Sequence, residues 1–117
     1  MRIRSDIFVS ALTRRVFNDG GYAAVVIKGS DASGAIFVRQ RFRDGLETLY
    51  GPTPQAFIEV EDRDDRLFEA RLTRVEPETT EALIARETKF DSDLWLVEIE
   101  VEEIGSYLQL EGASPSP

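Results

Sequence analysis

Apolar side chains near the start of the chain recur every four residues, a spacing typical of a helix with one buried face. The stripe consists of Phe8, Leu12 and Val16, with Ile7 and Ala11 beside it. Ser5 is a residue type that caps helix N-termini, and Gly20-Gly21 favours a helix end just before it. The pattern predicts a helix over residues 6–18.

Three strands are predicted after this helix. The segment "YAAVVIK" is apolar on both faces, which is typical of a central strand. Residues 34–42 then alternate, so that Phe37, Arg39 and Arg41 share one face. Asp44-Gly45 predicts a two-residue hairpin turn of type I′, because glycine tolerates the positive φ that this turn requires, and "LETLY" is the return strand.

The second half of the chain predicts one more helix and more strands. The segments "QAFIEVE" and "RLFEARL" flank the polar "DRDD", a pattern that predicts a second hairpin. Pro77 suits the first turn of a helix over residues 77–90. Its apolar stripe would consist of Thr79, Leu83, Arg86 and Phe90, with Ala82 adjacent. The last strand, "LWLVEIEVE", places Trp95, Val97, Ile99 and Val101 on one face and Leu96, Glu98, Glu100 and Glu102 on the other.

Tight turns between these strands favour antiparallel pairing. We therefore expect an α+β fold, with a mainly antiparallel sheet of about five strands and both helices packed on one face. Residues 1–111 are predicted to form a single domain, since a chain of 117 residues buries one modest core. The polar ending "EGASPSP" predicts a disordered tail over residues 112–117.

The chain contains no cysteine and no histidine, which removes several kinds of chemistry. Disulfides, thiolate nucleophiles, Cys/His zinc sites and Ser-His-Asp triads are all excluded. Catalysis would depend on carboxylates, lysines, tyrosines or an oxygen-bound cation. We expect no cofactor and no metal, and the composition argues against an enzyme.

The net charge of −8 argues against sequence-independent nucleic-acid binding, which requires cations to displace the counterions of phosphate. Residues 1–50 nevertheless carry a balance of +3, and residues 51–117 a balance of −11, so a basic face in the first half stays open. No apolar run is long enough to cross a membrane, and the start "MRIRSDIFVSALTRR" lacks a signal-peptide core. These features predict a cytoplasmic protein.

Gly29 and Gly34 have the spacing of the glycines in a phosphate-binding loop. The lysine and hydroxyl that should follow are Ala35 and Ile36 here, and a strand follows instead of a helix. We interpret residues 29–34 as a bend with both glycines at special backbone angles. A weak anion site at Ser30, Asp31 and Ser33 is the alternative.

Arg39, Arg41 and Arg43 form the best binding candidate, because three guanidinium groups on one strand face can grip phosphate or carboxylate. Glu98, Glu100 and Glu102 have the same period. If the two strands adjoin, opposite charges would pair across them on a solvated face and the arginines would bind nothing else.

A divalent-metal enzyme is a further hypothesis, with Asp31, Glu98 and Glu100 as its carboxylates. Residues two apart on a strand face solvent and diverge, so nothing in this pattern converges on a cation. "EDRDD" at residues 61–65 lacks the central glycine and the closing glutamate of a calcium loop.

Several segments resemble the bacterial family known as Domain of Unknown Function 1491. They are "FVSALTRRVFNDGGYAAVVIKGSDASGAIFVR", "LYGPTP", "RLFEARL" and "KFDSDLWLVEIE", and the likeness spans residues 3–101. One departure is Gly29-Ser30-Asp31, where the family tends to have Gly-Asp. The resemblance implies a compact bacterial protein and no assigned activity.

By elimination, the sequence favours a non-catalytic binding or adaptor domain. Its partner would be another protein, which meets an apolar patch or an open sheet edge, and a homodimer is one form of this. Two alternatives stay open: recognition of a phosphorylated ligand or nucleic acid by the arginine strand, and the carboxylate enzyme with a divalent metal.

Overall fold

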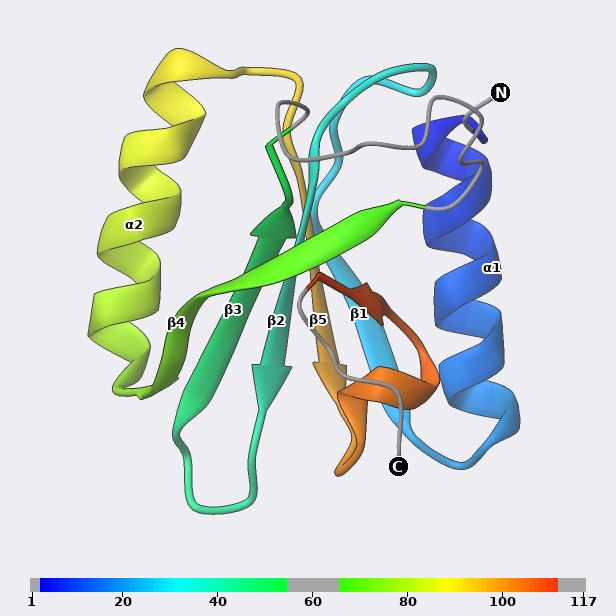
Figure 1. Cartoon of the computed structure of the whole chain (residues 1–117), viewed down its shortest axis with the longest axis vertical. Helices are drawn as coiled ribbons and strands as arrows, with labels where there is room; N and C mark the ends of the chain where they lie inside the picture. Colours follow the sequence, from blue (N-terminus) through cyan, green and yellow to red (C-terminus); the bar gives the residue numbers. More distant parts are fainter. Residues whose placement is uncertain (1–2, 55–65, 112–117) are drawn as a thin grey trace.

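The computed structural model describes residues 3–54 and 66–111. In these ranges two α-helices flank a six-stranded sheet whose strand order is β1-β5-β2-β3-β4-β6 (Figure 1). The elements are α1 (Ser5–Asn18), β1 (Tyr22–Ile27), β2 (Ile36–Arg41), β3 (Glu47–Pro52), β4 (Leu67–Val75), α2 (Pro77–Phe90), β5 (Trp95–Glu100), the 3-10 turn η2 (Ile104–Ser106) and β6 (Gln109–Leu110). Neither α-helix is long and apolar enough to span a membrane.

The α+β class is confirmed, but the sheet is mixed. β5 runs parallel to β2, and β6 runs parallel to β4, whereas the other neighbours are antiparallel. β5 follows α2 and inserts between β1 and β2. The sequence prediction paired strands that follow one another through tight turns, so it did not anticipate this insertion. The sixth strand is only two residues long, too short to leave a periodic signal.

The two helices lie on opposite faces of the sheet, so the expectation that both pack on one face is wrong (Figure 1). Along β2, Ile36 and Val38 pack with the residues of α1, whereas Phe37 packs with Ile84 of α2. Because side chains alternate along a strand, these two clusters must lie on opposite faces. Each helix therefore buries one apolar stripe, and the two faces of the central strands supply the side chains that pack against these stripes.

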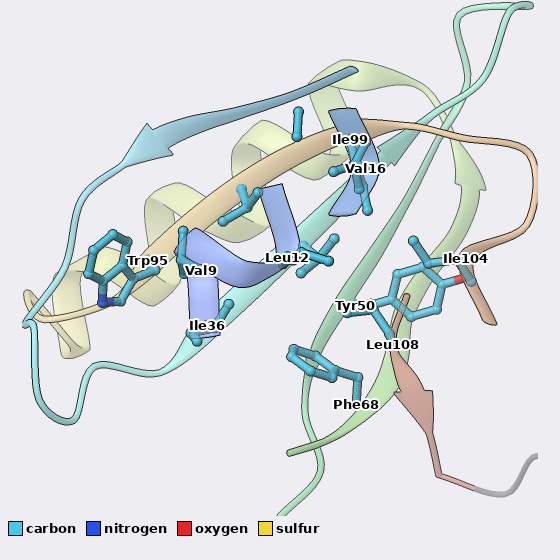
Figure 2. Packing of buried hydrophobic residues seen from close by; sticks show 13 residues of the cluster. Val9, Leu12, Val16, Ile36, Tyr50, Phe68, Trp95, Ile99, Ile104 and Leu108 are labelled. Atoms are coloured by element: carbon cyan, nitrogen blue, oxygen red, sulfur yellow. The ribbon is translucent and has the colours of Figure 1, made fainter. Parts of the chain in front are cut away.

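The larger core cluster joins α1 to the sheet (Figure 2). Val9, Leu12 and Val16 of α1 are buried, and they face the side of the sheet that carries Ile36 and Ile99. Beyond the helix, the cluster continues through Tyr50, Phe68, Ile104 and Leu108. The C-terminal segment thus covers the part of this face that α1 does not reach.

Both helices occur where predicted, with different contacts. In α1, Ile7 is half exposed and Val9 takes the buried position expected for it. Ser5 does not cap the helix; its Oγ donates to the carbonyl of Gly34 at 2.6 Å. In α2 the buried residues are Thr80 and Ile84, so the predicted stripe is wrong.

Two strand predictions also need correction. β1 is an edge strand and not a central one. In the loop from β2 to β3, only Gly45 has a positive φ, +90°, so the turn is not type I′, which requires it at both central residues. The Asp44 carboxylate accepts a bond from the Leu46 amide at 3.0 Å and holds this loop. The hairpin predicted around "DRDD" lies largely outside the described residues.

Candidate functional site

Arg39 lies at the centre of an ion network between the sheet and α2. It is paired in register with Glu98 on the parallel strand β5. Its guanidinium donates to Glu98 Oε1 at 2.7 Å and to Glu81 Oε1 of α2 at 2.8 Å. The Arg39 side chain is only 6% exposed, and it therefore needs these charged partners to offset its lost hydration.

Glu47 on β3 is the buried carboxylate of this network. Its side chain is fully buried, and its Oε2 accepts two bonds from Arg41, at 2.9 and 3.2 Å. Its Oε1 lies 4.0 Å from Arg39 Nε, too far for a hydrogen bond. The hydrogen bond from Arg41 to Glu47 raises the pKa of the Arg41 guanidinium.

The expected pairing of the arginine and glutamate faces is confirmed at Arg39 and Glu98, but the face is not solvated as predicted. Arg39 and Glu47 are buried beneath α2. Arg43 lies outside β2, in the exposed hairpin loop, and takes no part in the network. Two of the three candidate arginines therefore already bind carboxylates of this chain.

The loop at residues 29–34 is packed against the start of β5. A Cβ at Gly29 or Gly34 would collide with the Asp93 carbonyl, and neither glycine has a positive φ. Their role is close backbone approach, so the special backbone angles predicted for them are wrong. The Ser30 amide donates to the Asp93 carbonyl at 2.9 Å, and the Ser30 carbonyl accepts the Trp95 indole N–H at 2.8 Å.

The other candidate residues of this loop face solvent. Asp31 and Ser33 are exposed, and the Asp31 carbonyl accepts the amide of Asp6 at 2.9 Å. No bond from the Ser33 hydroxyl to another described residue is present. The loop therefore does not gather its polar groups around one point.

A cavity of about 550 Å³ adjoins Arg41 and Arg43, at the end of the sheet where β1 begins. Glu100 and Glu102 line the same cavity. Two carboxylates offset two guanidinium groups there, so the cavity has no excess of positive charge for an anion.

The carboxylates proposed for a metal enzyme do not converge. Glu98 belongs to the Arg39 network, Glu100 is exposed on β5, and Asp31 lies in the loop before β2. Among residues 3–54 and 66–111, no three acidic side chains are placed to hold a metal ion.

The free edge of the sheet at β1 is a feature that the sequence prediction missed. β1 pairs with β5 on one side, and its other side has no strand neighbour among the described residues. Tyr22, Val25 and Val26 are 46%, 45% and 49% exposed. A charge-free apolar strand is typical of the sheet centre, but in this strand order β1 lies at the edge.

Phe17 extends this apolar surface from the end of α1. It is 54% exposed, and its ring meets that of Tyr22 edge-on, with centroids 6.0 Å apart. We call Phe17, Tyr22, Val25 and Val26 the β1 edge surface. Exposed apolar side chains along an unpaired strand edge are typical of a contact surface.

Comparisons with known proteins agree with this fold and assign no activity. The family model described as "Protein of unknown function (DUF1491)" matches residues 3–109. The solution structure of protein Atu0922 from A. tumefaciens is 58% identical, with a TM-score of 0.86, over 99% of this chain and 100% of that chain. A crystal structure of a DUF1491 family protein from Caulobacter crescentus CB15 is 27% identical, with a TM-score of 0.76, over 96% of this chain and 100% of that one. No curated protein matches this chain. Because the family model spans nearly the whole sequence, the chain belongs to the DUF1491 family, whose function is unknown.

Proposed function

We propose that this protein is a non-catalytic binding domain and that an extended segment of a partner protein adds to the sheet along β1. The observation that carries the proposal is the β1 edge surface: an edge strand with exposed apolar side chains and no charged residue between Tyr22 and Ile27. Edge strands of stable proteins are normally protected by charges or proline, because their free N–H and C=O groups template further pairing. β1 has neither.

A bulge in β1 limits the length of the strand edge that a partner segment could pair with. The register of β1 with β5 shifts between Val25 and Ile27, which interrupts the ladder at Val26. Tyr22–Val25 thus forms the regular part of the free edge. Main-chain bonds over these four residues would supply affinity, and the side chains that alternate along them would supply specificity.

The internal use of the charged side chains supports a non-catalytic role. Arg39 is paired with Glu98 and Arg41 with Glu47, and the chain has no histidine or cysteine to act near neutral pH.

The occupant is a different protein and not a second copy of the chain. Each copy carries a net charge of −8, and Glu100 lies opposite Tyr22 in the register of β5 and β1. Association of two copies would oppose their equal net charges, whereas a neutral or basic strand avoids this repulsion.

The test is capture of partners from a lysate of the source organism by the immobilised protein and by its Val25→Lys variant. Lysine on a free edge opposes strand addition. The matched control is Ile7→Lys, because Ile7 is 50% exposed on α1 and lies outside the β1 edge surface. We expect one set of proteins to be retained by the parent and by Ile7→Lys, and lost with Val25→Lys.

Amide hydrogen exchange on the captured complex then locates the contact. Protection of the Tyr22–Val25 amides supports strand addition. Retention of the same proteins by Val25→Lys, or a stable dimer of the isolated chain by light scattering, would contradict the proposal.

A further inference from the structure

A separate pocket lies on the α1 side of the sheet, between that helix and the C-terminal segment. It has a volume of about 470 Å³, within the usual range of small-molecule sites. Phe8 and Arg15 line it from α1, where a spacing of two helical turns places them on one face. The other lining residues are Ile3, Arg66 and residues 105–109. The pocket therefore joins segments that are far apart in the sequence.

The walls of this pocket are apolar and are anchored in the larger core cluster. Leu108 is buried in that cluster together with Ile104 and Phe68 (Figure 2). The centre of the Phe8 ring lies 5.8 Å from that of Phe68, and both Phe8 and Tyr107 pack against the cluster. A preformed apolar wall of this kind shields the body of a small ligand from water.

Both cations that line the pocket are stacked on its aromatic walls. The Arg15 guanidinium carbon lies 5.4 Å from the centre of the Tyr107 ring. The Arg66 guanidinium carbon lies 5.7 Å from the centre of the Phe8 ring. A cation over an aromatic face is stabilised by the ring quadrupole. The stacking therefore positions both guanidinium groups in advance, which lowers the entropic cost of binding a ligand.

Arg15 is held by a neutral oxygen and not by a carboxylate. Its Nη2 donates to the Ser106 carbonyl at 2.6 Å, and Arg15 forms no ion pair within the described part of the chain. Asp19 accepts the Tyr107 hydroxyl at 2.7 Å and lines a different cavity. No aspartate or glutamate of residues 3–54 and 66–111 lines this pocket. Because a guanidinium has five N–H donors, Arg15 keeps several of them for an anion.

Arg66 supplies the buried cation of the pocket and is a rigid part of the fold. It is 8% exposed, and its Nη2 donates to the Ile3 carbonyl and to Ser5 Oγ, both at 3.0 Å. Ser5 Oγ in turn donates to the Gly34 carbonyl at 2.6 Å. Replacing Arg66 would disturb these contacts, so the pocket is best tested through Arg15.

We propose that this pocket binds a small organic acid, whose anionic head meets Arg15 and Arg66 and whose apolar body rests against the aromatic walls. The head is a carboxylate or a phosphate, because guanidinium groups bind both with paired, charge-assisted hydrogen bonds. The apolar walls favour an organic acid over a bare inorganic anion, which would make no contact with them. This site is separate from the β1 edge surface and requires no protein partner.

The probes are phenylacetate and phenyl phosphate. Inorganic phosphate lacks their apolar body, and 2-phenylethanol lacks their charge. Each compound is titrated into the ¹⁵N-labelled full chain while the amide signals are followed by NMR. We expect saturable shifts at residues 105–108 with at least one acid, at a dissociation constant of about 0.1–10 mM for a ligand of this size. Both analogues should bind at least about five-fold more weakly than that acid, which then identifies the head group.

Two pairs of variants separate the pocket from the effect of net charge. Arg15→Gln removes a cation of the pocket, and Arg14→Gln removes one from the neighbouring exposed position outside it. Ser106→Glu adds a carboxylate to the pocket lining, and Ser10→Glu adds one on α1 outside it. We expect Arg15→Gln and Ser106→Glu to weaken binding about ten-fold, because each removes charge-assisted bonding to the acid. The two controls should change binding by less than about two-fold.

Four outcomes would overturn this proposal. Equal weakening by Arg14→Gln and Arg15→Gln would mean that net charge alone attracts the acids. Equal affinity for 2-phenylethanol would reduce the pocket to an apolar cleft, and equal affinity for inorganic phosphate would reduce it to a bare anion site. The absence of saturable shifts at residues 105–108 up to about 20 mM of either acid would show that the pocket does not bind this class of ligand.

Discussion

At the residue scale, the most informative side chain is Glu47, a carboxylate with no solvent exposure. A buried carboxylate of this kind requires the two nearby arginines, because the desolvation cost of an isolated buried charge exceeds the stability of a typical domain. The sequence predicts Glu47 in the return strand of a hairpin but does not predict that its side chain is buried. The register of β3 with β2, opposite Arg41, decides its environment.

Replacing Glu47 with glutamine tests this network. We expect Glu47→Gln to lower the free energy of unfolding by about 3 kcal/mol, because it removes a fully buried carboxylate and leaves Glu98 to balance both Arg39 and Arg41. Glu81→Gln, at a position 68% exposed, should cost less than about 1 kcal/mol. Urea denaturation measures both, and similar effects for the two variants would contradict a buried network.

The two loop glycines allow an equally direct test. A Cβ at Gly34 would lie 2.9 Å from Trp95 Cδ1 and still closer to the Asp93 carbonyl, whereas one at Gly105 would meet nothing within 4 Å. We expect Gly34→Ala to destabilise the protein by about 1–3 kcal/mol through overpacking and Gly105→Ala to stay within about 0.5 kcal/mol. A neutral Gly34→Ala in thermal unfolding would argue against the packing role of the loop.

Burial raises the pKa of Tyr50 above its ordinary value of 10.0. The folded state therefore holds the phenol protonated to higher pH than the unfolded chain does. The linked stability is fully present below about pH 10 and is lost as the pH rises through the raised pKa. We expect the unfolding free energy of Tyr50→Phe to fall less steeply than that of the parent between about pH 9 and 11 in urea titrations. Parallel curves would contradict this assignment.

At the element scale, local pattern predicted a great deal. The helix over 77–90 and the alternation of Trp95, Val97 and Ile99 are confirmed, because a proline in the first helical turn and a period of two are signals carried by neighbouring residues. The α2 stripe was wrong since charged and polar residues dominate that helix, and its contacts depend on the sheet face opposite. Thr80 is buried and Phe90 is 85% exposed, which no local rule anticipates.

The corrected face of α2 leads to a comparison of two apolar residues on one helix. We expect Ile84→Ala to cost about 2–5 kcal/mol, because Ile84 is buried against Leu49 and Leu96. Phe90→Ala should change the unfolding free energy by less than about 0.5 kcal/mol. If chemical denaturation showed a larger loss of unfolding free energy for Phe90→Ala than for Ile84→Ala, the result would support the stripe predicted from sequence and contradict the structure.

At the scale of the whole molecule, the sequence identified charge pairing but could not place the free surfaces. Arg39 and Glu98 were recognised as potential partners from their equal period, and the parallel register of β2 and β5 brings them together. The β1 edge surface depends on strand order, which arises from contacts between segments far apart in the chain.

The pairing of Arg39 and Arg41 with carboxylates and the uncharged edge at β1 both support the proposed binding role. The most direct measurement is photo-crosslinking in cells with benzoylphenylalanine in place of Tyr22 or of Phe90, two exposed aromatic residues on different elements. The account predicts a discrete cross-linked protein partner from position 22 and none from position 90. Equal cross-linking from both positions, or none from position 22, would contradict it.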